Sequence, residues 1–159
     1  MKKLLLLLSM MCLAALTMQA QSYVDLGLPS GTKWKTSNEK NTADANNGFF
    51  TYDEAVSRFG KRLPTKVQWE ELKDECQWSW IGNGYRVTGP NGNSITLPAE
   101  GFRYCDGDVA DDLVGSFGGY WSSTLNSPDN AWYIRFYDFG VSINDYVRCD
   151  GRSIRLVQD

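Results

Sequence analysis

The sequence predicts an α+β fold in which two short helices pack on antiparallel strands. Two capped helix starts lie in the first half of the chain, and no other long stretch has helical periodicity. The second half carries short runs of β-branched and aromatic residues separated by turn residues. Helices followed by a series of strands are typical of the α+β class. No internal repeat or flexible linker divides the chain, so we expect a single domain.

Residues 1–20 have the pattern of a secretory signal peptide. Two lysines precede an apolar run over residues 4–16, and the segment ends at the small residue Ala20. This run is too short for a membrane span with its own flanks. We expect cleavage near Ala20, a mature chain of about 139 residues that starts near Gln21, and no membrane span after cleavage. Export to the periplasm, the cell surface or the medium follows.

Composition and charge exclude several function classes. Without the two lysines of the signal, 14 basic side chains stand against 19 acidic ones, so the net charge is near −5, and no long basic run occurs. Nucleic acid is therefore not an expected partner. Histidine is absent, which removes the commonest general base and the commonest zinc ligand.

The mature chain begins with a predicted strand, a turn and a second strand. In "SYVDLGLPSGTKW" a Pro-Ser-Gly turn separates two apolar runs, and we expect Leu26, Leu28 and Trp34 in the core. A polar loop over residues 38–48 follows.

The first helix is predicted within "TYDEAVSRFG". Thr51 and Glu54 have the spacing of a capping box, and Gly60 is a stop signal. Its apolar stripe is formed by Ala55, Val56 and Phe59.

The second helix is predicted to start within "RLPTKVQWEEL". Thr65 and Gln68 form another capping box, and Pro64 prevents the helix from extending backwards. Its buried face is formed by Trp69, Leu72 and Cys76, at i, i+3 and i+7.

Strands are predicted from residue 85 onward. In "YRVTGPNGNSITLP" a Gly-Pro-Asn-Gly turn separates Val87 from Ile95 and Leu97. Four further short strands are predicted at "GGYWSST", "NAWYIRF", "GVSINDYV" and "RSIRLV".

Several of these blocks resemble known families. "RLPTKVQWE" is similar to the helix start "RLPTEAEWE" of formylglycine-generating-enzyme/sulfatase-modifying domains. "YVDLGLPSGTKW", "LPTKVQWEEL", "GYRVTGPNGNSITLPAEGFR", "GGYWSST" and "GRSIRLV" resemble, in order, the blocks of the secreted paralogous FISUMP family. The resemblance implies a C-type-lectin-like fold over residues 21–159. Two departures are Ser37, near a position where that family commonly has a cysteine, and a shortened insertion before the first helix.

Catalysis is not expected. Formylglycine-generating enzymes use a reactive cysteine pair that engages copper, whereas Cys76 here lies on an apolar helix face, where a structural thiol is the usual interpretation. The serines of "YWSST" have no histidine to act as base. We expect no catalytic residue and no cofactor.

Calcium is the one metal alternative. Four aspartates of "DGDVADD" offer the oxygen ligands that calcium prefers, although most such clusters are solvated loops. These residues are Asp106, Asp108, Asp111 and Asp112. The sugar-chelating motifs of animal C-type lectins are missing.

A disulfide is expected between Cys105 and Cys149. Both replace residues that are not usually cysteine in the resembling family, and both lie in predicted loops near the last strands. Two unrelated thiols are the alternative. The bond would close a loop of about 45 residues, which corresponds to about 3–4 kcal/mol in the chain-entropy model.

The last predicted hairpin suggests a binding face. Its apolar residues alternate with polar and aromatic ones, and the apolar sets of both strands must share one side of the sheet. A two-residue turn at Phe139-Gly140, or a four-residue loop around it, pairs Phe136 with Ile143 and places Tyr133 opposite Tyr146. Arg135 then lies opposite Asn144, and Tyr137 opposite Ser142. We assign ligand binding to Tyr133, Arg135, Tyr137, Ser142, Asn144, Tyr146 and Arg148. The alternative is that a helix or the N-terminal strand covers this face.

Two function classes remain. The first is an exported, non-catalytic binding module that holds an extracellular or envelope glycan or protein through its lectin-like face. The second is a structural or assembly component of the cell envelope. Some lectin-fold proteins are also diversified by retroelements in their last strands, and the composition between Asn126 and Arg148 is compatible with that.

Overall fold

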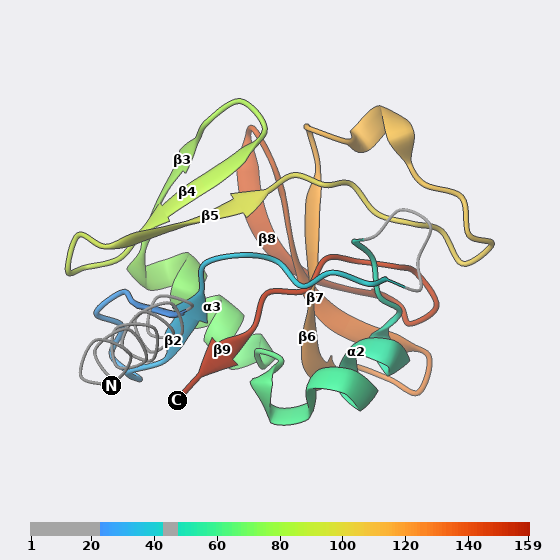
Figure 1. Ribbon diagram of the computed structural model, residues 1–159, viewed down its shortest axis with the longest axis horizontal. Helices are drawn as coiled ribbons and strands as arrows, with labels where there is room; N and C mark the ends of the chain where they lie inside the picture. Colours follow the sequence, from blue (N-terminus) through green and yellow to red (C-terminus); the bar gives the residue numbers. More distant parts are fainter. Residues whose placement is uncertain (1–22, 43–47) are drawn as a thin grey trace, which may run out of the picture.

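The computed structural model describes residues 23–42 and 48–159 (Figure 1). In this part of the chain, two short α-helices accompany three antiparallel sheets of three strands each. The predicted α+β class is confirmed. No helix among these residues is long and apolar enough to cross a membrane. The expected signal peptide lies outside the described residues.

One sheet joins the two ends of the described chain. Its strands, in spatial order, are β1 (Tyr23–Asp25), β2 (Lys33–Lys35) and β9 (Val157–Gln158). Trp34, in the central strand, lies opposite Val24 and Val157. Leu26, Leu28 and Trp34 are buried, as predicted.

The first helix, α2 (Tyr52–Phe59), starts at the predicted capping box. The Thr51 backbone N–H donates to the Glu54 carboxylate at 2.9 Å, and the Glu54 N–H donates to the Thr51 hydroxyl at 3.3 Å. The predicted stripe is only partly correct, because Ala55 is buried but Val56 is 36% exposed. Tyr52 is buried instead, at the first position of the helix.

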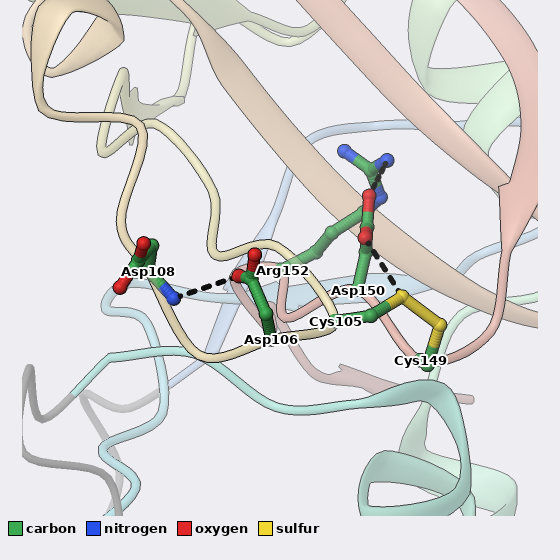
Figure 2. The surroundings of a disulfide bond; sticks show 6 residues. All are labelled: Cys105, Asp106, Asp108, Cys149, Asp150 and Arg152. Atoms are coloured by element: carbon green, nitrogen blue, oxygen red, sulfur yellow. Dashed lines mark hydrogen bonds and ion pairs between the residues drawn. A yellow bond between two sulfur atoms is a disulfide. The ribbon is translucent and has the colours of Figure 1, made fainter.

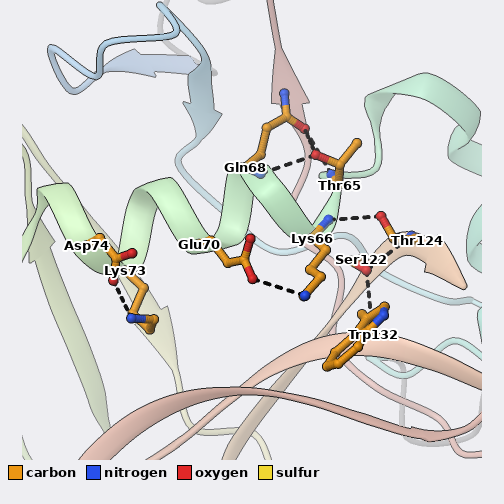
Figure 3. Close-up of polar contacts among 9 residues, drawn as sticks. All are labelled: Thr65, Lys66, Gln68, Glu70, Lys73, Asp74, Ser122, Thr124 and Trp132. Atoms are coloured by element: carbon orange, nitrogen blue, oxygen red, sulfur yellow. Dashed lines mark hydrogen bonds and ion pairs between the residues drawn. The ribbon is translucent and has the colours of Figure 1, made fainter. Parts of the chain in front are cut away.

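The second helix, α3 (Lys66–Glu75), also starts at its predicted capping box (Figure 3). The Thr65 N–H donates to Gln68 Oε1 at 2.9 Å. The helix's first backbone N–H, at Lys66, donates to the Thr124 hydroxyl at 3.0 Å. Trp69 is fully buried, as predicted.

Cys76 departs from the prediction. It follows the last residue of α3 with an extended backbone, φ −106° and ψ 157°. The helical spacing therefore no longer determines where its side chain lies. Its thiol is free and partly buried against the core rather than fully buried.

A second sheet follows α3 directly. Its strands are β3 (Gln77–Trp80), β4 (Gly84–Thr88) and β5 (Ser94–Pro98). The predicted β4–β5 hairpin is confirmed, with Val87 opposite Ile95. β3 was not predicted; its two tryptophans pack edge-on against Tyr85 of β4.

The third sheet contains the longest strands. They are β6 (Gly118–Leu125), β7 (Asn130–Tyr137) and β8 (Gly140–Val147). The β7–β8 turn consists of Asp138 and Phe139, because Tyr137 pairs with Gly140. Ile143 therefore lies opposite Ile134, and the predicted pairing with Phe136 is wrong by two residues. The rule that both apolar sets share one side still holds, since a shift of two preserves it.

Hydrophobic clusters cover both sides of this sheet. On one side, Ile134 and Phe136 join the cluster that contains Trp69 of α3. On the other side, Trp121 and Tyr133 join a cluster completed by α2 and by the segment that precedes β9. This second cluster covers part of the face on which a binding site was predicted.

The predicted strand "RSIRLV" is mostly an extended segment with isolated bridges. Arg152 pairs with Phe50, and Ser153 pairs with Tyr120, before the chain enters β9. Two charged residues of this segment, Arg152 and Arg155, are almost completely buried. The aromatic rings around Arg152 and the hydrogen-bond acceptors of Arg155 lie far away in the sequence.

Candidate ligand-binding face

The structure places six of the seven predicted ligand residues on one side of the β7–β8 hairpin. Tyr133 lies opposite Asn144, and Arg135 lies opposite Ser142. Tyr137 lies opposite Gly140, and Tyr146 lies opposite Ala131. The predicted cross-strand pairs are therefore wrong, although the residues share a face. The seventh residue is Arg148, just beyond the end of β8.

Tyr133 is not accessible on this face. Only 4% of its surface is exposed, and its ring contacts Trp121 edge-on at 5.8 Å between centroids. The side chain that covers it is Arg152, whose guanidinium carbon lies 3.9 Å from the centre of the Tyr133 ring. The predicted exposure of Tyr133 is wrong because an arginine of the same chain occupies the position expected for a ligand.

Aromatic rings surround this arginine. The Arg152 guanidinium lies 5.0 Å from the Trp121 ring, 5.3 Å from Phe102 and 5.4 Å from Tyr146. Its ion-pair partner is Asp150, at 3.3 Å. Burial lowers the pKa of Arg152 and raises the pKa of Asp150, so for both groups desolvation outweighs the attraction between them.

The predicted disulfide between Cys105 and Cys149 is confirmed (Figure 2). Their Cα atoms are 4.9 Å apart, and both residues are exposed. The bond ties the loop after Arg103 to the end of β8. Asp150 Oδ1 lies 3.3 Å from Cys105 Sγ, so the disulfide packs against the Asp150–Arg152 pair.

The four predicted calcium ligands do not gather around one point. Asp106 accepts a hydrogen bond from the Asp108 backbone N–H at 3.1 Å, as in an ordinary turn. Asp111 and Asp112 start the short 3₁₀ helix η2 (Asp111–Leu113). Within the described chain, the set of potential ligands whose atoms lie within 4.8 Å of one another is Cys105, Cys149 and Asp150. Both cysteines of that set are joined in the disulfide.

A groove of about 620 Å³ begins where β8 ends. Arg148 lies inside it, pairs with Asp53 of α2 and donates to the Pro128 carbonyl at 2.8 Å. The guanidinium also lies 5.2 Å from the centre of the Tyr52 ring. The groove is lined by Thr51, Asp53, Pro128, Asp129, Val147, Arg148 and Cys149. Arg148 therefore links three segments, and both of its terminal nitrogens already donate within the protein.

The accessible part of the face lies toward the hairpin turn. Arg135 and Ser142 are half-buried, and Arg135 Nε donates to Ser142 Oγ at 3.2 Å. The Tyr137 ring stacks on Phe139, with 5.0 Å between centroids and 4° between planes. Phe139 is 83% exposed, and sequence reasoning assigned it only to the turn. The sequence signal that could have assigned Phe139 to the candidate face is its position as an aromatic residue in a hairpin turn, two residues from Tyr137.

At the other end of the hairpin, Asn144 is half-buried and Tyr146 is 50% exposed. The accessible face as a whole thus carries the Arg135 cation, the Ser142 hydroxyl, the Asn144 amide and three aromatic rings. This combination suits noncovalent recognition. The three rings belong to Tyr137, Phe139 and Tyr146. The free thiol of Cys76 lies elsewhere, between α3 and β3. Burial, followed by the charges of Glu71 and Glu75, raises its pKa to about 11, which disfavours the nucleophilic thiolate.

A family model for a domain of unknown function, DUF8237, matches residues 67–157. The chain belongs to the DUF8237 family. The DUF8237 match runs from the first turn of α3 to the first residue of β9, and it contains the whole β7–β8 hairpin and both cysteines of the disulfide. No functionally curated protein and no solved structure matches the chain.

Proposed function

We propose that this DUF8237 protein is an exported, non-catalytic binding module that holds an extracellular or envelope glycan or protein. The observation that supports this best is the outer part of the β7–β8 face. The side chains that lie there on one antiparallel hairpin are Arg135, Ser142, Asn144, Tyr146 and the Tyr137–Phe139 ring pair. Sites built on paired strands hold their side chains more accurately than sites on loops.

A C-type-lectin-like fold of the FISUMP type is part of the proposal. Its support is the ordered set of sequence blocks, together with two short helices that pack on antiparallel strands. The absence of histidine from the sequence supports a non-catalytic role. The N-terminal signal pattern supports export.

A glycan array and a pull-down from envelope proteins test this proposal. The protein purified after expression of the full-length sequence should capture a defined ligand. Replacing both Asn144 and Tyr146 by Ala should remove capture without changing the circular dichroism spectrum. Val67→Ala is the matched control, because Val67 is 69% exposed on α3, away from the face. Capture that survives the double substitution would contradict the assignment of this face.

An assembly role in the envelope is the alternative that one observation favours. β8 is an edge strand, and its outward backbone groups have no backbone partner among the described residues over 140–146. Such an edge accepts a strand from another chain. Sedimentation of the purified protein distinguishes the two roles, since an assembly subunit should form oligomers at micromolar concentration and a binding module should remain in its smallest form.

A further inference from the structure

Arg135 is a cation that pairs with no carboxylate of the described residues. Its Nε donates to Ser142, and within the described part of the chain it forms no ion pair. A guanidinium has five N–H donors in a planar fork, so its terminal nitrogens have unused capacity. Because Ser142 fixes one edge of the fork, the other edge is oriented for an external acceptor.

A second guanidinium lies beside it on the same face. The residue opposite Arg135 on β6 is Gly119, and a Cβ there would lie 3.0 Å from Arg152 Nη1. Arg152 thus occupies the space that a side chain at Gly119 would fill. Burial is the main cause of the lowered pKa of Arg152, and repulsion from Arg135 is a smaller one. Two guanidinium groups therefore lie on this face, and of the two only Arg152 is paired with a carboxylate of the described residues, that of Asp150, although the sequence as a whole has a net charge of −3.

The Tyr137–Phe139 pair lies next to this positive region. Tyr137 is two residues from Arg135 on the same strand face, a separation of about 7 Å. Its ring and that of Phe139 are nearly parallel and form a flat apolar surface, most of it open to solvent on the Phe139 side. Aromatic side chains are enriched at recognition surfaces, so an exposed aromatic pair beside a guanidinium favours a contact with a ligand.

We infer that this face selects acidic saccharides, with the Arg135 guanidinium holding the carboxylate and the Tyr137–Phe139 pair stacking on a sugar ring. The inference rests on the proposed binding function and narrows it to one ligand class. A uronic or sialic acid presents an apolar C–H face of its ring and a carboxylate in a fixed relation, which matches an aromatic ring pair beside the Arg135 guanidinium. An acidic peptide presents its carboxylates on flexible stems without that ring face, so it matches only half of the site.

The test uses three hexamers of equal length: galacturonic acid, galactose and glutamic acid. Binding to the protein purified after full-length expression is measured by calorimetry at two salt concentrations. We expect the galacturonic acid hexamer to bind at least about tenfold more tightly than the other two, and more weakly at high salt.

Matched variants locate the interaction. Arg135→Gln keeps polar donors but removes the charge, and it should weaken galacturonate binding by about tenfold or more. Phe139→Ala should weaken it without changing the salt dependence. Arg86→Gln changes the net charge equally at an exposed position of β4, and it should leave binding within about twofold.

The remaining outcomes separate this inference from the proposed function. Equal binding of the galactose and galacturonic acid hexamers would overturn the acidic specificity and leave a glycan-binding module. Equal or tighter binding of the glutamic acid hexamer would overturn the saccharide class. If no hexamer binds while the array or the pull-down identifies another ligand, this inference fails and the proposed function stands. If nothing binds in any format, both fail.

Discussion

The Arg152 guanidinium carbon lies 3.9 Å from the centre of the Tyr133 ring, although neither side chain is accessible to solvent. The contact joins the C-terminal segment to the central strand β7. The Arg152 side chain covers the β7–β8 face at Tyr133, whereas the part of the face toward the hairpin turn is accessible. The accessible part therefore lies next to a buried guanidinium.

Removing Arg152 should destabilise the protein strongly. Arg152→Met leaves Asp150 buried without its ion-pair partner, and we expect a loss of about 3 kcal/mol or more in the free energy of unfolding. Adding Asp150→Asn should recover part of that loss, because the uncompensated charge disappears. Urea unfolding of the disulfide-intact protein measures both. An Arg152→Met variant as stable as an Arg86→Met control would show that the pair has no structural role.

Reducing the Cys105–Cys149 bond should lower the free energy of unfolding by about 3–4 kcal/mol, because the bond closes a long loop in the unfolded chain. The Cys105→Ser/Cys149→Ser double variant should match the reduced protein. Thiol labelling of the unfolded, unreduced protein should detect Cys76 as one free thiol per leader-free chain. Three labelled thiols would show that the bond does not form.

Thr65→Ala should lower the free energy of unfolding by about 1 kcal/mol. The substitution removes the hydroxyl that accepts a hydrogen bond from the Gln68 N–H in the capping box of α3. Thr65→Ser retains the hydroxyl and should cost much less. Thermal unfolding compares the two variants. Equal losses would mean that the methyl group, rather than the cap, stabilises this helix start.

Cys76 should react slowly with iodoacetamide at pH 8 in the folded protein, because its pKa is raised to about 11 and the thiolate is scarce there. The rate should increase with pH until about pH 11. The pKa of the Cys76 thiol is higher in the folded state than in the unfolded state. The thiol therefore makes its whole contribution to the free energy of unfolding when the pH is below the unfolded-state pKa. That contribution is lost as the pH rises through about 11, and Cys76→Ser should remove this part of the pH dependence. A folded-state rate equal to that of free cysteine at pH 8 would contradict the prediction.

Export should remove the first twenty residues. Mass spectrometry of the protein recovered from its final compartment should find a new N-terminus at or near Gln21. Retention of Met1 on a cytoplasmic protein would be incompatible with the signal-peptide interpretation.

Features that depend on neighbouring residues were predictable. Both capping boxes and the β4–β5 hairpin follow from short sequence signals, and all three are present. The side-chain parity of the β7–β8 hairpin was also predictable, because a one-residue slip would expose its apolar set. The turn was not, since Gly140 suggested a turn position but in fact pairs with Tyr137.

Features that depend on distant residues were not predictable. Nothing near Arg152 in the sequence indicates that its guanidinium is buried among Phe102, Trp121 and Tyr133. The accessibility of the candidate face depends on that contact. Strand periodicity alone therefore identified which residues share the face. It could not show that Tyr133, one of them, is buried.

The sheet formed by β1, β2 and β9 determines how the protein responds to tension. β1 and β9 both run antiparallel to β2, and Tyr23 and Gln158 lie toward opposite ends of that strand, near Lys35 and Lys33. Pulling outward on Tyr23 and Gln158 therefore slides the outer strands past β2 in opposite directions. Hydrogen bonds perpendicular to the strands then resist the load together instead of opening one by one. A domain pulled through both of these strands would therefore meet the load first at this sheet, before it reaches the β7–β8 hairpin.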